Sequence, residues 1–504
     1  MPVAPAIPLP TGNTPPPHTL KDNTGMSSSR RDILRGFAGI TASAALAQTA
    51  PRPNFLVIVT DDQGIGDVGC YGHPEVRTPN LDRLAASGVR FTQWFANAPV
   101  CSASRAAIMT GKYPDRTGVK GALPSEPSWD VNGLRQGEQT LPGLLRDRGY
   151  GTAAFGKWHL GSAPASRPRA QGFDDFFGWY SGWLDAYSHR YYQLGSAPGK
   201  IFHDLWRNET EVFEEPAYMT ELLGREAQSY LAKQSSAQPF LLYLAFGAPH
   251  YSMMAPKKYL DRFPATMDRD RRTHLAMVAA VDDVVGALLD QLRRQGLDSS
   301  TVVYYQADNG ATREVRASSD GKPYHGGSNE PYRGYKLGLF DGGMHVPAIL
   351  RAPGLRPGQV WDRPLISMDL LPTFLAMADP AAPPPVGIDG QNILPVLRGE
   401  KPEHEFLFWS HENQRAIRQG DWKLILNPPQ FPGEEMPDKA WLSNLEERPL
   451  GEEKSGERTN RPSPRTDGKA QSLGTRSGPF DASALNFHKC RSPVLTRFVM
   501  SRTL

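Results

Sequence analysis

Residues 54–60, NFLVIVT, followed directly by Asp61-Asp62, decide the fold. This apolar run has no polar alternation, which is typical of a strand buried on both faces of a parallel sheet. Two further apolar runs, at 240–246 and 301–306, have the same character, and the second leads into Asp308-Asn309. Open α/β sheets place ligands at the carboxyl ends of their strands. We therefore expect an α/β protein whose site gathers at that edge.

The rest of the chain continues the alternation of helices and strands. Capping and periodicity predict helices over 78–88, 139–149, 271–295 and 367–377, and a strand over 347–351. Residues 163–218 are rich in aromatics and lack a period, so we expect long loops over the site. After the proline run at 380–385, segments 405–409 and 415–426 predict antiparallel strands, the second with a turn at 419–421. The expected domains are 51–380 (catalytic) and 381–446 (a small C-terminal subdomain).

Composition narrows the class of protein. The 504 residues hold 48 Gly and 46 Pro, which indicates many turns and long loops. The net charge of +3 comes from the ends, because residues 1–50 and 447–504 are both basic and the body carries about −4. No nucleic-acid surface is therefore expected. Three cysteines, Cys70, Cys101 and Cys490, are too few for a disulfide framework.

The N-terminus resembles an export signal. Residues 29–35, SRRDILR, form a twin-arginine pattern, followed by an apolar stretch at 36–45 and the small-residue site Ala45-Leu46-Ala47. The alternative is an ordinary amphipathic helix start. We expect export to the periplasm or beyond, with 1–50 as an extension plus signal in which Met1 and Met26 are alternative start positions. Residues 447–504 are expected to be disordered or the product of a frame shift, and no run approaches a membrane span.

The acidic pairs at two strand ends are candidate metal ligands. Asp61, Asp62, Asp308 and Asn309 offer four hard oxygen ligands, which suits Ca²⁺ or Mg²⁺ rather than zinc. Either pair alone is more often a structural cap. The combination of both, 250 or so residues apart, favours a cation site.

Cationic and titratable side chains at predicted strand ends and loops suggest the ligand. They are Lys157, His159, His250 and Lys336. Singly, each is better explained as a surface charge or a packed histidine. A divalent cation ringed by such groups suits a tetrahedral anion, and phosphate and sulfate esters both qualify.

Residues 99–111, PVCSASRAAIMTG, place Cys101 just before a predicted helix that begins at Ser102 to Arg105. A sulfur aimed at free helix N–H groups becomes reactive, whereas a small buried cysteine at a loop–helix junction is the structural alternative.

Together these motifs resemble the formylglycine-dependent sulfatases of the alkaline phosphatase superfamily. CSASR at 101–105 with MTG at 109–111 is similar to the family's first signature, and GYGTAAFGKWH at 149–159 to its second. The resemblance runs from about residue 53 to 445 and includes the APH, DNG, GYK and DGG segments at 248–250, 308–310, 334–336 and 341–343. Their joint order is far more specific than any one motif. The expected fold is therefore alkaline-phosphatase-like, with a mostly parallel sheet between helices and a small antiparallel C-terminal subdomain.

The resemblance implies a chemistry for Cys101. A formylglycine-generating or sulfatase-maturating enzyme would oxidise it to Cα-formylglycine. One hydroxyl of the aldehyde hydrate would bind Ca²⁺, with Mg²⁺ as the alternative, and the other would attack sulfur. The metal ligands would be Asp61, Asp62, Asp308, Asn309 and the group derived from Cys101.

The resemblance also assigns the remaining site residues. Arg105 would hold the formylglycine, and Lys157 and Lys336 would bind sulfate oxygens. His250 would protonate the leaving alcohol, and His159 would help to expel sulfate.

Three positions depart from the family pattern: Ala103 stands where proline is most frequent, Asp341 where glutamate is usual, and His345 where arginine is usual.

The substrate class and two alternatives remain open. The GGSN segment at 326–329 is similar to sulfatases acting on sulfated sugars, including N-acetylgalactosamine-6-sulfatases, so we expect a sulfated small molecule or saccharide. The aromatic segment around Trp179, Trp183, Tyr187 and His189 is a candidate sugar platform, though packing explains it equally. The alternatives are a phosphonate or phosphate monoester hydrolase and a non-catalytic binder of sulfated glycans.

Overall fold

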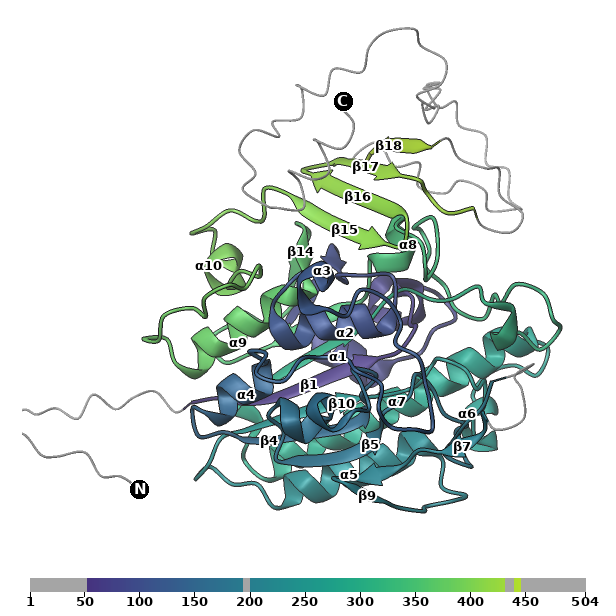
Figure 1. The fold of residues 1–504 in the computed structure, drawn as a ribbon, viewed down its shortest axis with the longest axis horizontal. Helices are drawn as coiled ribbons and strands as arrows, with labels where there is room; N and C mark the ends of the chain where they lie inside the picture. Colours follow the sequence, from purple (N-terminus) through teal and green to yellow (C-terminus); the bar gives the residue numbers. More distant parts are fainter. Residues whose placement is uncertain (1–51, 194–199, 431–438, 446–504) are drawn as a thin grey trace, which may run out of the picture. The chain divides into compact units, whose positions relative to one another are not determined.

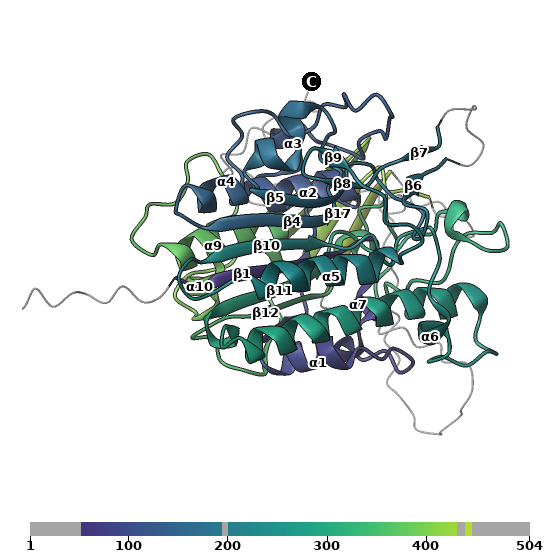
Figure 2. The ribbon, with the colours of Figure 1, turned by 90° about the horizontal axis from the view of Figure 1, so that it is seen from below.

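The large sheet of the computed structural model confirms the predicted fold class. The structure describes residues 52–193, 200–430 and 439–445. Ten strands form this sheet in the order β13-β2-β12-β11-β1-β10-β4-β5-β8-β9, and several of them can be followed down Figure 2. The strands are β1 (Asn54–Thr60), β2 (Val89–Phe91), β4 (Gly151–Lys157), β5 (Asp175–Trp179), β8 (Trp206–Arg207), β9 (Thr210–Glu211), β10 (Phe240–Ala245), β11 (Thr301–Ala307), β12 (Ala348–Arg351) and β13 (Gln359–Trp361).

The middle of the sheet is parallel. Strands β11, β1, β10, β4 and β5 run in one direction, whereas β12 and β8 pair antiparallel at either side. Every residue of β1 is buried, as its apolar run predicts. The carboxyl ends of these five adjacent parallel strands therefore meet at one edge.

Helices cover both faces of this sheet, because side chains of β1 point alternately to each side. Phe55, Val57 and Val59 pack in one cluster with α2 (Cys101–Thr110), α4 (Leu141–Arg146), α9 (Leu370–Ala378) and α10 (Ile393–Leu397). Leu56 and Ile58 pack in the other with α1 (Pro79–Ala86), α5 (Met219–Ala232) and α7 (Arg269–Arg294). Figure 2 shows α5 and α7 crossing in front of the strands.

A four-stranded antiparallel sheet follows near the C-terminus, as predicted. It consists of β15 (Leu407–His411), β16 (Gln414–Gln419), β17 (Trp422–Leu426) and β18 (Ala440–Asn444), drawn in yellow-green at the top of Figure 1. Trp409 on β15 packs against Phe95, and its indole N–H donates to the carbonyl of Ala96 at 2.9 Å. The subdomain therefore docks on the chain segment that leads into α2.

The segment 163–218 corrects the expectation of loops alone. It contributes β5 to the large sheet, and the short strands β6 (Arg190–Tyr191) and β7 (Phe202–His203) form a pair of their own. The predicted helix over 139–149 shortens to α4. Helix α5 and the two-stranded pair of β3 (Trp94–Phe95) and β14 (Leu365–Ile366) were not predicted.

The remaining α-helices among the described residues are short: α3 (Pro114–Thr117), α6 (Lys257–Leu260) and α8 (Asp341–Met344). Among the described residues, no helix combines the length and apolarity that crossing a membrane requires. The twin-arginine segment, Cys490 and the tail 447–504 lie outside the described residues, and the domain boundaries stay a prediction.

Candidate active site

The ends of four neighbouring strands bring the predicted site residues together. Asp61-Asp62 follow β1, Asp308-Asn309 follow β11, Lys157 is the last residue of β4, and His250 lies in the loop after β10. The register aligns these ends, because Thr60 pairs with Ala307 across the β1–β11 ladder. The convergence predicted from the apolar runs is therefore present.

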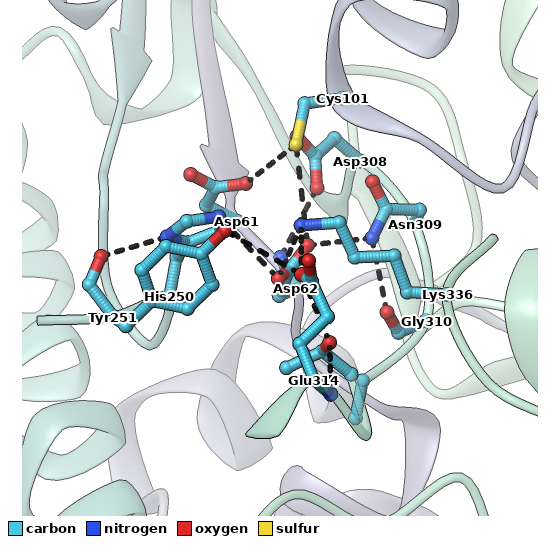
Figure 3. Close-up of polar contacts among 12 residues, drawn as sticks. Asp61, Asp62, Cys101, His250, Tyr251, Asp308, Asn309, Gly310, Glu314 and Lys336 are labelled. Atoms are coloured by element: carbon cyan, nitrogen blue, oxygen red, sulfur yellow. Dashed lines mark hydrogen bonds and ion pairs between the residues drawn. The ribbon is translucent and has the colours of Figure 1, made fainter. Parts of the chain in front are cut away.

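Carboxylates form the centre of the site (Figure 3). Asp61, Asp62 and Asp308 are at most 1 % exposed, as is Asn309. The backbone N–H of Asp62 donates to Asp308 Oδ1 at 3.2 Å, and Asn309 Nδ2 donates to Asp62 Oδ1 at 2.7 Å. Asp62 adopts a φ of 57°, a left-handed conformation that Asp tolerates better than most residues. The strand ends thus hold their polar groups tightly against one another.

Helix α2 supplies Cys101 and Arg105. Cys101 is its first residue, one position earlier than the sequence predicted, and its Sγ lies 3.3 Å from Asp61 Oδ1. Arg105 lies one turn further on the same face and is fully buried. Its Nε donates to Asp308 Oδ2 at 2.9 Å, and its terminal nitrogen Nη2 forms an ion-pair contact with the same oxygen at 2.8 Å. Arg105 therefore fixes Asp308 relative to Cys101.

Two lysines hold the other carboxylates. Lys157 Nζ donates to Asp61 Oδ2 at 2.6 Å, and Lys336 Nζ donates to Asp62 Oδ2 at 2.7 Å. Lys336 also lies 3.3 Å from Glu314 Oε2. Burial opposes the charge of Lys336, but Asp62 and the other anionic neighbours raise its pKa well above the usual value, so it is an ammonium ion.

The two predicted histidines lie at the site in different roles. His250 bonds through Nδ1 to the Tyr251 carbonyl at 2.7 Å, and its Nε2 lies 3.6 Å from Asp62 Oδ2. His159 has a φ of 53° and bonds through Nε2 to the Leu123 carbonyl at 3.0 Å. Burial, reinforced by neighbouring lysines, lowers the pKa of both rings well below 6.5. Both are therefore neutral imidazoles at pH 7.

Burial and crowding set the protonation of the carboxylates. Burial raises the pKa of Asp61 to about 7 and also raises that of Asp62, because the lysines only partly offset the loss of water and the repulsion by Asp308. Burial acts on Asp308 too, but Arg105 and Lys157 outweigh it and lower its pKa. The cluster thus sets three buried carboxylates against three cations, and its aspartates differ in how readily they take up a proton.

This donor set fits a hard divalent cation. Asn309 Oδ1 is buried and has no hydrogen-bond partner among the described residues. Ligand atoms of Asp61, Asp62, Cys101 and His250 lie within 4.8 Å of one another. Carboxylate and amide oxygens are the ligands that Ca²⁺ and Mg²⁺ prefer, and a cation here would offset the burial and the repulsion that raise the pKa values of Asp61 and Asp62.

Sequence analysis missed a group of residues beside Lys336. Glu314 and Arg316 form an ion pair, and the Arg316 guanidinium lies over the rings of Tyr251 and Trp183 at 4.7 and 5.2 Å. The available signal was the position of Glu314 and Arg316, six and eight residues after Asp308, because a loop that leaves a strand-end ligand stays near the site.

The fold and the cluster define a class of protein, an α/β hydrolase that acts on anions. Comparison with known proteins narrows this class to one family. The family model described as Sulfatase matches residues 53–380. Human N-acetylgalactosamine-6-sulfatase is 34% identical over 393 residues, covering 75% of this chain and 72% of the relative. Mouse arylsulfatase J is 31% identical over 422 residues, covering 78% and 67%.

Comparison with solved structures supports the same family. The crystal structure of Ps i-CgsB in complex with k-i-k-neocarrahexaose has a TM-score of 0.68 and 31% identity, covering 78% of this chain and 86% of that one. The chain belongs to the sulfatase family and is a sulfatase.

Proposed function

We propose that the chain is an exported sulfatase that removes sulfate from a saccharide, with Cα-formylglycine at Cys101 and Ca²⁺ as its cofactors. The observation that carries this proposal is the position of Cys101, buried at the start of α2 and 3.3 Å from Asp61 within a cluster of carboxylates and cations. No other described cysteine lies in that cluster.

The unmodified thiol is a poor nucleophile. Burial and the neighbouring Asp61 raise the pKa of Cys101 far above its ordinary value, so a reactive thiolate does not form at neutral pH. Oxidation to formylglycine by a maturating enzyme replaces this inert thiol. The hydrated aldehyde would supply the attacking hydroxyl, and a bound cation would lower the pKa of the hydrate and attract the sulfate oxygens. Asp61, Asp62, Asp308 and Asn309 would hold the cation.

Residues of the chain orient the ester. Lys157 and Lys336 reach the cluster from β4 and from the loop before α8, and their ammonium groups would donate to sulfate oxygens. Arg105 keeps Asp308 and the first turn of α2 in place. Lys157 contacts Asp61 and Lys336 contacts Asp62, so the two ammonium groups lie at different aspartates of the cluster. They can therefore bind an anion from two directions.

His250 is proposed as the acid for the leaving alcohol. It is neutral in the free enzyme, with its Nδ1–H donated to Tyr251 and Nε2 open toward Asp62. An anionic substrate beside the ring raises its pKa, so substrate binding and protonation of Nε2 are coupled. His159 is proposed to assist the release of sulfate.

A saccharide is the proposed carrier of the sulfate. The first curated relatives are N-acetylgalactosamine-6-sulfatases, and the chain has a partly exposed Trp183 beside His250, with ring centroids 6.4 Å apart. An aromatic face next to the leaving-group acid suits the apolar side of a sugar ring.

Four measurements test the proposal. The enzyme is produced with a formylglycine-generating enzyme, and mass spectrometry of the Cys101 peptide must show the CH₂SH group replaced by CHO. Rates on an aryl sulfate and the matching aryl phosphate are then compared, and a panel of defined sulfated saccharides gives the substrate. A higher phosphate rate would favour the phosphate or phosphonate hydrolase, and an unmodified thiol without turnover would favour the non-catalytic binder. Export is tested by fusing residues 1–50 to a reporter that reaches the periplasm only when folded.

A further inference from the structure

A second cluster of metal-ligating side chains lies outside the active site. His189, His203 and Glu215 each offer one ligand atom, and these atoms lie within 4.8 Å of one another. His203 ends β7, and Arg190, the residue after His189, pairs with it across the β6–β7 ladder. Glu215 comes from the chain that leads into α5. Three separate segments thus converge on one point.

The hydrogen bonds fix which nitrogen of each imidazole is free. His189 Nε2 lies 2.9 Å from the carbonyl oxygen of Ala217, which only accepts, so Nε2 carries the proton. His203 Nδ1 lies 2.8 Å from Glu211 Oε1 and donates to it in the same way. The lone pairs therefore reside on Nδ1 of His189 and, in the neutral ring, on Nε2 of His203.

Those two nitrogens are buried and lack a hydrogen-bond partner within the described residues. The residues His189 and His203 are 0 % and 6 % exposed. Buried polar atoms are nearly always satisfied, so two orphans side by side call for a missing partner. A carbonyl or carboxylate on the far nitrogen is also what metal-bound histidines require, because it sets the tautomer and orients the ring.

An ion pair between His203 and its glutamate neighbours explains fewer of these observations than a bound metal ion does. If His203 were protonated, it would sit between Glu211 and Glu215, the latter 3.5 Å from Nε2. That arrangement leaves His189 Nδ1 without a hydrogen-bond partner among the described residues. The 3.5 Å separation is also close to the roughly 3.4 Å between two ligand atoms around tetrahedral zinc.

We propose that His189 Nδ1, His203 Nε2 and a Glu215 oxygen bind a Zn²⁺ ion, with water as the fourth ligand. Two imidazoles and one carboxylate suit zinc, whereas Ca²⁺ prefers an all-oxygen site such as the catalytic cluster. Glu211 is the outer carboxylate that holds His203. The side chain of Glu215 is 27 % exposed, which leaves a path for the ion and the water.

The proposed zinc site would stabilise a group of aromatic side chains beside the active site. Tyr191 on β6 packs against Trp183 with ring centroids 4.3 Å apart, and Trp183 lies beside His250. Zinc would link β6, β7 and the segment that leads into α5, and would thereby fix the positions of Tyr191 and Trp183. The ion would act there through position, because it touches none of the catalytic side chains.

Metal content of the mature enzyme tests the proposal. Metal-depleted protein is given one equivalent of Zn²⁺ in excess Ca²⁺, desalted and analysed for both elements. We expect the wild type and the control His325→Gln, which removes a half-exposed histidine elsewhere, to retain one zinc, and His203→Gln to retain none. No zinc in the wild type, or equal zinc in His203→Gln, overturns the proposal.

A milder variant keeps the test decisive if His203→Gln does not fold. Glu211→Gln removes only the outer carboxylate and should weaken zinc binding by about 10- to 100-fold. Zinc at about a hundred times its Kd should raise the wild-type Tm by roughly 3 °C, and at the same concentration should raise that of Glu211→Gln less. Equal shifts in both proteins would show that the histidine pair is not the zinc site.

Discussion

Glu314→Gln should change the enzyme's preference between sulfate and phosphate esters. The carboxylate lies 3.3 Å from the ammonium group of Lys336, the residue proposed to bind a sulfate oxygen. Although burial opposes its charge, Lys336 and Arg316 lower the pKa of Glu314, so it is ionised at pH 7. A fixed negative charge beside the anion site repels a dianion more than a monoanion.

The geometry sets the size of this effect. An ester oxygen held by Lys336 at about 2.8 Å lies no more than about 6 Å from Glu314 Oε2, given the 3.3 Å lysine–glutamate contact. Two unit charges about 6 Å apart interact by about 3 kcal/mol at an effective dielectric constant of about 20, which is roughly a hundredfold. A phosphate monoester carries nearly one more negative charge than a sulfate monoester above pH 6. Because Arg316 and water screen the carboxylate, we expect a gain of about 10- to 100-fold in phosphate over sulfate selectivity.

The assay measures kcat/KM for an aryl sulfate and the matching aryl phosphate at pH 7.5 or so, where the phosphate is a dianion. Glu330→Gln is the matched control, because it removes an exposed carboxylate from the loop before Lys336. The ratio should change in Glu314→Gln and stay constant in the control. A ratio within about threefold of the wild type would refute the electrostatic reasoning, whatever happens to the two rates individually.

Four further outcomes follow from the site. Cys101→Ala should abolish turnover and leave the circular dichroism spectrum unchanged, and normal turnover would exclude the formylglycine mechanism. Arg105→Met should destabilise the metal-depleted protein by about 3–5 kcal/mol in urea unfolding, because Asp308 is left buried without its main partner; a loss below 1 kcal/mol or so would contradict this. Calorimetric Ca²⁺ affinity should fall as pH drops below about 7, by up to tenfold per unit, because Asp61 takes up a proton there. In the cation-free protein the raised pKa of Asp61 has the opposite consequence: the folded state holds this proton more tightly than the unfolded chain, so stability should decrease from pH 4 to 7.

Strand ends were the part of the site that the sequence could predict. The runs that became β1, β10 and β11 are apolar throughout, and a strand buried on both faces belongs to the middle of a parallel sheet. Once those strands are parallel and adjacent, the residues that follow them must share an edge. Asp61 and Asp308 were predicted on this ground, whereas the roles of Cys101 and Arg105 on helix α2 rested on the motif resemblance.

Other features had no comparable signal. Strand β5 reads DFFGW, which includes an exposed Asp175 and a glycine, so neither alternation nor a continuous apolar run marks it. It is a strand because β4 offers it an edge, which is a tertiary cause. The His189–His203–Glu215 cluster is invisible for a similar reason, because its spacing of 14 and 12 residues matches no metal motif.

The register of the sheet therefore determines whether the site residues meet. A slip of two residues between β1 and β11 preserves which face each side chain points to, yet moves Asp308 by about 6.6 Å along the strand. Arg105, on helix α2, donates from Nε to Asp308 Oδ2 at 2.9 Å, so that slip would break this buried ion pair. The charged cluster thus penalises the alternative register that the apolar side chains alone would tolerate. Its ion pairs contribute to the uniqueness of the fold as well as to the site, which is why they can be retained although buried ion pairs add little net stability.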